Sequence, residues 1–114
     1  MRVLEFKDNY AHQNKGINVT CRLGDEFADL KTGERIVLQD MDTPASRCAV
    51  VNSTWSGPLK DMPEFIIILE HDPALRDREA IRKAMEKYFH EEVTLDSVVT
   101  AISYTPLADI EPED

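Results

Sequence analysis

The spacing of the predicted strands is the feature that most restricts the fold of this chain. Runs of alternating or β-branched residues predict strands at residues 3–6, 19–22, 35–38, 47–51 and 98–104. Parallel strands need a long crossover, usually a helix, and few of these runs are separated by one. The loop around Pro44 is expected to join two of the runs as an antiparallel pair. We therefore expect an α+β chain built on a curved, mostly antiparallel β-sheet or barrel, and not a doubly wound parallel sheet.

The sequence predicts two main helices that pack against one side of this sheet. One begins at Asp77, a good N-cap, and its apolar residues form one stripe: Ala80, Ile81, Ala84, Met85, Tyr88 and Phe89. The opposite, basic-leaning face of this helix is expected to be a solvated surface. The other helix is predicted to begin at Asp61, with Pro63 in its first turn, and to run through residues 65–69. It should end before Pro73, because proline disfavours the α conformation in the preceding residue.

A short helix is also expected near the N-terminus, at residues 9–15. Asp8 is a good N-cap for this helix, and Gly16 lies just past its end. Gly16 is expected to adopt a positive φ there, which closes the helix and leads the chain into the strand at residues 19–22.

The residues around this turn are typical of a binding loop that runs into a strand. On the strand, Thr20 and Arg22 are expected to lie side by side on one face. Lys15 and Asn18 precede them on the turn. A hydroxyl and a guanidinium with these two neighbours suit an anionic or amide-rich ligand, such as a phosphate or the edge of a nucleobase. The alternative is that Lys15 and Arg22 are ordinary surface charges that flank a tight turn.

Further candidates for ligand contacts lie outside this loop. Trp55 is the single tryptophan, and it would either stack on a base or cap the open end of the core. Arg47 is a candidate for a second-line contact. His71 lies between Glu70 and Asp72 and is a candidate for titration near neutral pH, although a histidine at a helix end is more often a cap or a dipole partner.

Length and charge limit the class of protein. The chain has 114 residues, enough for one domain with one hydrophobic core, which we place at residues 1–104. Residues 105–114 are expected to form an acidic, disordered tail. The formal net charge of −9 argues against broad non-specific binding to nucleic acid, which depends on clustered lysine and arginine. It leaves room for a local basic cleft.

Cysteine usage and hydropathy point to a cytoplasmic protein. Cys21 and Cys48 fall in predicted strands with no close spacing. We therefore expect buried thiols in a reducing compartment, and neither a disulfide framework nor a zinc site. No apolar run of the sequence is long enough for a signal peptide or a membrane span. We expect no metal, no cofactor and no membrane partner.

The order of these elements and several short motifs resemble the ASCH domains of the PUA-like superfamily. The motifs are the loop into Thr20-Cys21-Arg22, the turn at residues 30–34, the helix start at residues 61–63 and the helix end at residues 69–73. The resemblance covers residues 3–104. It implies a β-barrel with flanking helices, and a cleft between barrel and helices that holds RNA or a nucleotide.

The resemblance also implies a set of catalytic positions. Some members similar in size are amidohydrolases that remove the acetyl group from acetylcytidine with a lysine, a threonine and a glutamate. The threonine corresponds to Thr20, and the glutamate to a position near Asp72, with Glu70 close by. The lysine position, three residues before the threonine, is Ile17 here, and Lys15 is the nearest substitute. The chain departs from the pattern at this point, because Ile17 can neither attack an acyl carbonyl nor move a proton.

Three classes of function are compatible with these observations. The favoured one is a non-catalytic module that binds RNA or a nucleotide through a set of polar and aromatic residues: Lys15, Asn18, Thr20, Arg22, Arg47 and Trp55. The second is a small hydrolase acting on a modified nucleoside or an RNA backbone, with a nucleophile and an acid–base pair drawn from Lys15, Thr20, Glu70 and Asp72. The third is a protein that binds another protein, suggested by the acidic balance and the acidic tail.

Overall fold

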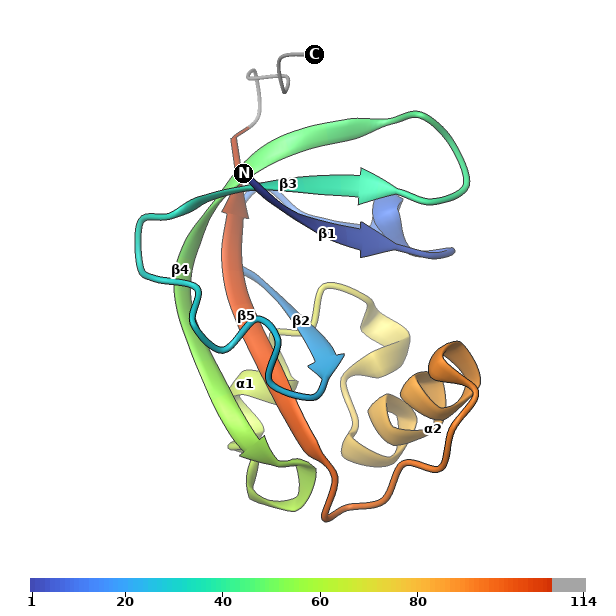
Figure 1. Ribbon diagram of the computed structural model, residues 1–114. Coiled ribbons are helices and arrows are strands. Elements are labelled where there is room, and N and C mark those ends of the chain that lie inside the picture. Colours follow the sequence, from blue (N-terminus) through green and yellow to red (C-terminus); the bar gives the residue numbers. More distant parts are fainter. Residues whose placement is uncertain (108–114) are drawn as a thin grey trace.

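The computed structural model describes residues 1–107, which form one curled sheet with helices packed beside it (Figure 1). The strands are β1 (Arg2–Phe6), β2 (Asn18–Leu23), β3 (Arg35–Asp40), β4 (Ser46–Pro58) and β5 (Val98–Pro106). The α-helices are α1 (Glu64–Ile67) and α2 (Arg78–Phe89). Single 3-10 turns are η1 (Tyr10–His12), η2 (Leu59–Asp61) and η3 (Pro73–Leu75). The predicted α+β class is confirmed.

Strand β4 organises the sheet because it is long enough to change partners along its length. The strand order is β1-β3-β4-β5-β2. The first part of β4 is antiparallel to β3, and most of the strand is antiparallel to β5, with a register shift between Val51 and Ser53. Such a shift bends a strand and increases its twist. The predicted curved, mostly antiparallel sheet is confirmed, with one parallel pair between β1 and β3. It is a half-barrel, because β1 and β2 are the two edges of the described sheet.

Both faces of the sheet are covered by apolar side chains. One core lies inside the curl and draws on most of the strands: Leu4, Phe6, Leu30, Ile36, Leu38, Ala49, Val51, Ile102 and Tyr104. The other core joins the opposite face to the helices: Val19, Leu59, Met62, Ile67, Ile81, Met85, Val93, Val99 and Ala101. Strand β5 contributes to both cores, because successive side chains of a strand point to opposite faces.

Helix α2 begins where the sequence predicts. The Asp77 carboxylate accepts a hydrogen bond from the Ala80 N–H at 3.0 Å, and the helix ends at His90 in the left-handed conformation. Ile81 and Met85 of the predicted apolar stripe are buried in the core against the sheet. The stripe thus fixes which face of α2 meets the sheet.

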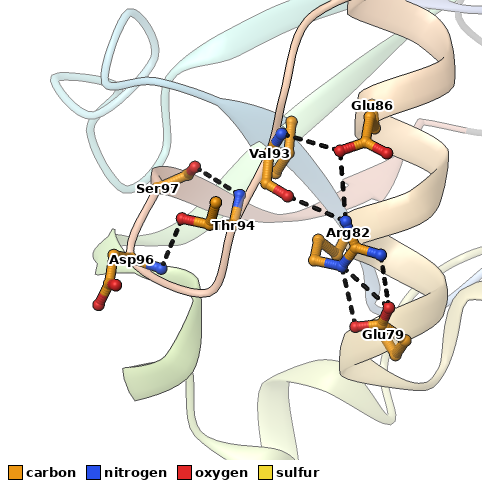
Figure 2. Close-up of polar contacts among 7 residues, drawn as sticks. All are labelled: Glu79, Arg82, Glu86, Val93, Thr94, Asp96 and Ser97. Atoms are coloured by element: carbon orange, nitrogen blue, oxygen red, sulfur yellow. Dashed lines mark hydrogen bonds and ion pairs between the residues drawn. The ribbon is translucent and has the colours of Figure 1, made fainter.

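The opposite face of α2 is tied to the chain that follows it (Figure 2). Arg82 donates to both oxygens of Glu79 and to the Val93 carbonyl at 3.0 Å, and Glu86 accepts from the Val93 N–H at 3.1 Å. The sequence predicted that this face of α2 would be a solvated surface, but in the structure it is bonded to the loop that follows the helix. These bonds hold α2 in place beside β2, where it forms one wall of the site described below.

The predicted N-terminal helix at residues 9–15 is wrong except for the single 3-10 turn η1. Asp8 has a φ of 70° and does not cap a helix, and Gly16 does not have the expected positive φ. The cause lies in Asn18, whose side chain accepts from the Asn14 N–H at 3.0 Å and donates to the Asn14 carbonyl at 3.0 Å. Side-chain bonds of this kind offer the backbone an alternative to the helix.

The predicted second helix is also shorter than expected. Asp61 belongs to η2 rather than to a helix cap, and α1 begins after Pro63 and has only 4 residues. Beyond it, the chain turns and pairs with β2: the Leu69 carbonyl accepts from the Val19 N–H at 3.0 Å. The His71 N–H donates to the Val19 carbonyl at 2.8 Å. The backbone groups that would have extended the helix bind the sheet edge instead.

The remaining sequence-based expectations concern the ends of the chain and the membrane. Strand β5 continues to Pro106, 2 residues past the boundary predicted at 104. Residues 108–114, most of the expected acidic tail, lie outside the described residues. Within residues 1–107, the structure contains no helix of the length and apolar character needed to cross a membrane.

The cap of α2 gives a test of this local structure. Replacing Asp77 by alanine removes the acceptor of the Ala80 N–H, and we expect the free energy of unfolding to fall by about 1 kcal/mol. Asp77→Asn keeps an acceptor oxygen and should lose much less. Urea unfolding of the three proteins measures the difference, and equal losses for the two variants would contradict the role of the cap.

Candidate functional site

A cleft of about 730 Å³ opens between the sheet edges and α2. It is lined by residues 5–9 of β1 and the turn after it, by residues 20–22 of β2, by residues 70–72, and by residues of α2. In Figure 1, β1 lies above β2, and α2 lies below and to the right of β2. The volume falls within the range of small-molecule sites, which is about 300–1,000 Å³.

Arg22 connects the two edges of the half-barrel at the cleft. From β2, its Nη1 donates to the carbonyl of Glu5 in β1 at 2.6 Å. Its guanidinium also lies over the Phe6 ring, 4.7 Å from the centroid, as a cation–π contact. Burial lowers the pKa of Arg22, because the charged form loses water. The Nε atom is buried and has no hydrogen-bond partner among residues 1–107.

Glu70 and His71 reach the cleft because their backbone pairs with β2. Their side chains are only 1% and 2% exposed. His71 Nδ1 lies 3.2 Å from the Val19 carbonyl, and the Phe6 ring packs edge-on against the imidazole. Nδ1 also lies 2.5 Å from Glu70 Oε1, but that approach lacks hydrogen-bond geometry. Within the described chain, Glu70 Oε1 and His71 Nε2 are therefore buried polar atoms without a partner.

Thr20 and Cys21 complete the part of the cleft that β2 supplies. Thr20 is buried, and Cys21 is half-buried because it borders the open space. Burial raises the pKa of the Cys21 thiol, and the neighbouring Glu70 carboxylate raises it further. Cys21 is therefore a neutral thiol at physiological pH and a poor nucleophile. Cys21 and Cys48 are both free, as the sequence predicts.

Asp72 joins the rim of the cleft to the N-terminal turn. It accepts from the Ala74 N–H at 3.0 Å and from Asn9 at 3.4 Å, and it lies 3.3 Å from Nδ1 of His12. Burial by itself raises the pKa of Asp72, but the hydrogen bonds from Ala74, Asn9 and His12 outweigh it and leave the pKa lowered. Asp72 is thus an ionised anchor of the rim.

The structure brings together some of the residues singled out in the sequence. Thr20, Arg22, Glu70 and Asp72 all line the cleft. The remaining candidates are Lys15, Asn18, Arg47 and Trp55, and these do not line it.

The positions of these remaining candidates have local explanations. Asn18 is fully buried and binds the backbone of the preceding turn. Arg47 binds the hydroxyl of Tyr10. Trp55 is half-buried, packs against the core shared by the sheet and the helices, and places its ring next to Gly57. Lys15 is exposed on the turn before β2.

Three apolar residues at the cleft were not recognised from the sequence as candidates: Met41, Tyr88 and Phe89. Tyr88 and Phe89 were assigned to the core stripe of α2, but they are 40% and 39% exposed. The sequence pattern indicated Tyr88 and Phe89 in part, because the apolar stripe continues to the last turn of the helix. The sequence does not show that the sheet ends before that turn.

The architecture is a curled half-barrel with two helices beside it. The chain matches no protein-family model and no curated protein. Among solved structures, it is similar to an ASCH domain from Lactobacillus crispatus JV V101, with a TM-score of 0.58 and 12% identity. That match covers 78% of this chain and 63% of the other, so the chain spans less than two thirds of that structure's length.

A second solved structure gives the same assignment of fold. Protein EF3133 from Enterococcus faecalis V583, described under the family model DUF984, matches with a TM-score of 0.67 and 14% identity. The match covers 94% of this chain and 76% of that one. The chain has the fold of an ASCH domain, which confirms the resemblance noted in its sequence. Identities this low establish the fold alone.

The bridge made by Arg22 predicts a measurable loss of stability. In Arg22→Met the Glu5 carbonyl loses a charged donor and Phe6 loses its cation, so the free energy of unfolding should fall by about 1–3 kcal/mol. Arg35→Met is the matched control on an exposed arginine of β3 and should change stability by less than about 0.5 kcal/mol. Denaturant unfolding measures the loss of free energy in both variants. Similar losses in Arg22→Met and Arg35→Met would contradict a stabilising role of the Arg22 bridge.

The lowered pKa of Asp72 predicts a dependence of stability on pH. A carboxyl whose pKa is lower in the folded than in the unfolded chain stabilises the fold above the unfolded value, about 3.9. This contribution is lost as the pH falls through the lowered folded value. The difference in unfolding free energy between the unaltered protein and Asp72→Asn should therefore be present at about pH 5 and shrink below about pH 4. A difference that stays constant in acid would contradict the assignment.

Proposed function

We propose that the cleft binds a nucleobase, presented by a nucleotide or by an unpaired base of RNA, and that the protein is a non-catalytic binding module. The observation that carries the proposal is a group of buried polar atoms without partners in the described chain: Arg22 Nε, Glu70 Oε1 and His71 Nε2. All three residues line the same cleft. A cytoplasmic location accompanies the proposal, supported by the free cysteines.

The chemistry of these atoms suits a base edge better than a phosphate. Buried polar groups are normally hydrogen-bonded, so this set is adapted to a ligand that supplies the missing partners. Arg22 Nε carries an N–H that can donate to a ligand acceptor, and Glu70 Oε1 makes no hydrogen bond in the described chain and can accept from a ligand donor. A base edge carries carbonyl or ring-nitrogen acceptors together with amino or imino donors. A phosphate carries only acceptors at neutral pH and would meet the Glu70 carboxylate with repulsion.

Apolar side chains line the cleft as well as the polar atoms of Arg22, Glu70 and His71, which we call the floor of the cleft. Ile81, Ala84 and Met85 of α2 line the cleft together with Leu75 of η3. Specific RNA recognition uses bases that are splayed out of the stack, and a cleft with one apolar wall and a polar floor has the form that such a base requires.

Hydrolysis of an acylated nucleoside is the second candidate function, because Thr20 and Glu70 both line the cleft. The position of the lysine in the related amidohydrolases is Ile17 here, which is 54% exposed and not part of the cleft lining. Of the described lysines, Lys7 and Lys87 line the cleft, and Lys7 is paired with Asp42 at 2.5 Å. Turnover of acetylcytidine that disappears in Thr20→Ala would favour this candidate over the binding module.

Titration with nucleosides tests the binding proposal. Amide resonances of residues 20–22 and 70–72 should shift when cytidine, uridine, adenosine or guanosine is added. Glu70→Gln keeps the size of the side chain but removes the charged acceptor. It should weaken binding of the amino-bearing nucleosides about tenfold or more, since hydrogen bonds to charged groups contribute about 1.5–3 kcal/mol. Glu91→Gln, on an exposed glutamate, is the control. No shift at these residues at millimolar nucleoside would remove the proposal.

A further inference from the structure

The mouth of the cleft carries exposed apolar side chains from two separate elements. Tyr88 and Phe89 come from the last turn of α2 and Met41 from the loop after β3, and all three line the cleft. Met41 is 47% exposed, comparable to Tyr88 and Phe89. Large apolar groups gathered at the mouth of a cleft are more informative than single exposed ones, because contiguous apolar patches mark binding sites.

These side chains contact one another across the mouth. The Tyr88 hydroxyl donates to Met41 Sδ at 3.0 Å. Phe89 meets the Tyr88 ring edge-on, with the centroids 4.9 Å apart and the planes at 77°. Phe89 therefore braces the tyrosine ring, while the thioether is a weak acceptor that a ligand can readily displace.

The backbones that carry Tyr88 and Met41 are both held in place. The Met41 N–H donates to the Phe6 carbonyl at 2.9 Å, which ties its loop to β1. On the other side, Arg82 binds the Val93 carbonyl and fixes α2 to the turn before β5 (Figure 2). The two backbones are thus positioned in advance, and this lowers the entropy lost when a ligand is held between them.

Charge does not provide an alternative means of holding a ligand here. The charged residues around the mouth carry both signs: Glu5, Lys7, Asp8, Asp72 and Lys87. Lys7 is already paired with Asp42, so the mouth offers no concentrated positive charge to a phosphate.

We infer that Tyr88 and Met41 are the two sides of a stacking clamp, which holds the planar ring of the nucleobase between an aromatic face and a thioether. This inference rests on the proposed function, because it requires the base edge to reach Arg22 and Glu70 on the floor. An aromatic face stacks on any base, and the polarisable sulfur of methionine makes favourable contacts with aromatic rings. The ligand replaces the contact between the Tyr88 hydroxyl and Met41 when it enters. Tyr88 thereby determines affinity, and the floor determines which base is chosen.

Alanine and phenylalanine at position 88 test the clamp, with adenosine and cytidine as probes. Tyr88→Ala should weaken binding of both nucleosides roughly 5- to 150-fold, the range for loss of one base–aromatic stack. Tyr88→Phe keeps the ring and should bind within about threefold of the unaltered protein. Phe65→Ala, an aromatic truncation at an exposed position of α1, is the matched control and should change nothing.

A spectroscopic measurement separates a stacking role from a merely structural one. On saturation with adenosine, the ring protons of Tyr88 and the methyl protons of Met41 should move upfield, because both would lie over the face of the base. Equal affinity of Tyr88→Ala and the unaltered protein would overturn the clamp while leaving the proposed function in place. Equal weakening in Tyr88→Phe and Tyr88→Ala would also overturn it, since the ring would then be irrelevant. Failure of the unaltered protein to bind any nucleoside would overturn the proposed function itself.

Discussion

The contact between Arg22 and the backbone of β1 is the interaction on which the rest of the structure depends. The two edge strands of the described half-barrel are not paired with each other, and a guanidinium from β2 spans the gap to the Glu5 carbonyl. Withdrawing a cation from water is expensive unless it is hydrogen-bonded, and for the half-buried Arg22 the Glu5 carbonyl and the face of Phe6 share that role. A backbone ladder at this place would close the barrel and leave no cleft. The bridge made by the Arg22 side chain connects the two edge strands and leaves the space between them open.

The edge of β2 that is not paired with β5 is covered at Val19 by the segment after α1, and the same pairing builds the site. Edge strands expose unpaired N–H and carbonyl groups, which invite association with other chains. Here the N–H and carbonyl of Val19 bond to Leu69 and His71. Because side chains alternate along such a segment, its pairing with β2 fixes where Glu70 and His71 can lie. Protection of the edge and placement of two polar residues at the cleft follow from one short stretch of backbone.

Much of the fold could be predicted from the sequence, and the failures have a common cause. Alternation in the strands and the Asp77 cap with its apolar stripe depend on local chemistry, so they were visible. The helix expected at residues 9–15 was displaced by the side chain of Asn18, and the second helix was cut short by bonds to Val19. In both cases a partner outside the helix pattern satisfied the backbone better than the helix would. At the cleft, Thr20 and Arg22 followed from the strand period. The exposure of Tyr88 depends on where the sheet ends, which no local pattern reports.

The unpaired atoms at the floor of the cleft bear on the relation between stability and function. A buried donor or acceptor left without a partner costs about 1–3 kcal/mol, and a charged one costs more. Arg22, Glu70 and His71 each hold such an atom in the described chain. The Nη1 bond to Glu5 accounts for the Arg22 guanidinium, and the Nδ1 contact with the Val19 carbonyl accounts for one side of the His71 ring. These contacts leave Arg22 Nε, His71 Nε2 and Glu70 Oε1 without a hydrogen bond, so stability does not explain why these atoms lie at the cleft. The nucleobase that we propose as the ligand would supply the missing partners and would recover that free energy on binding.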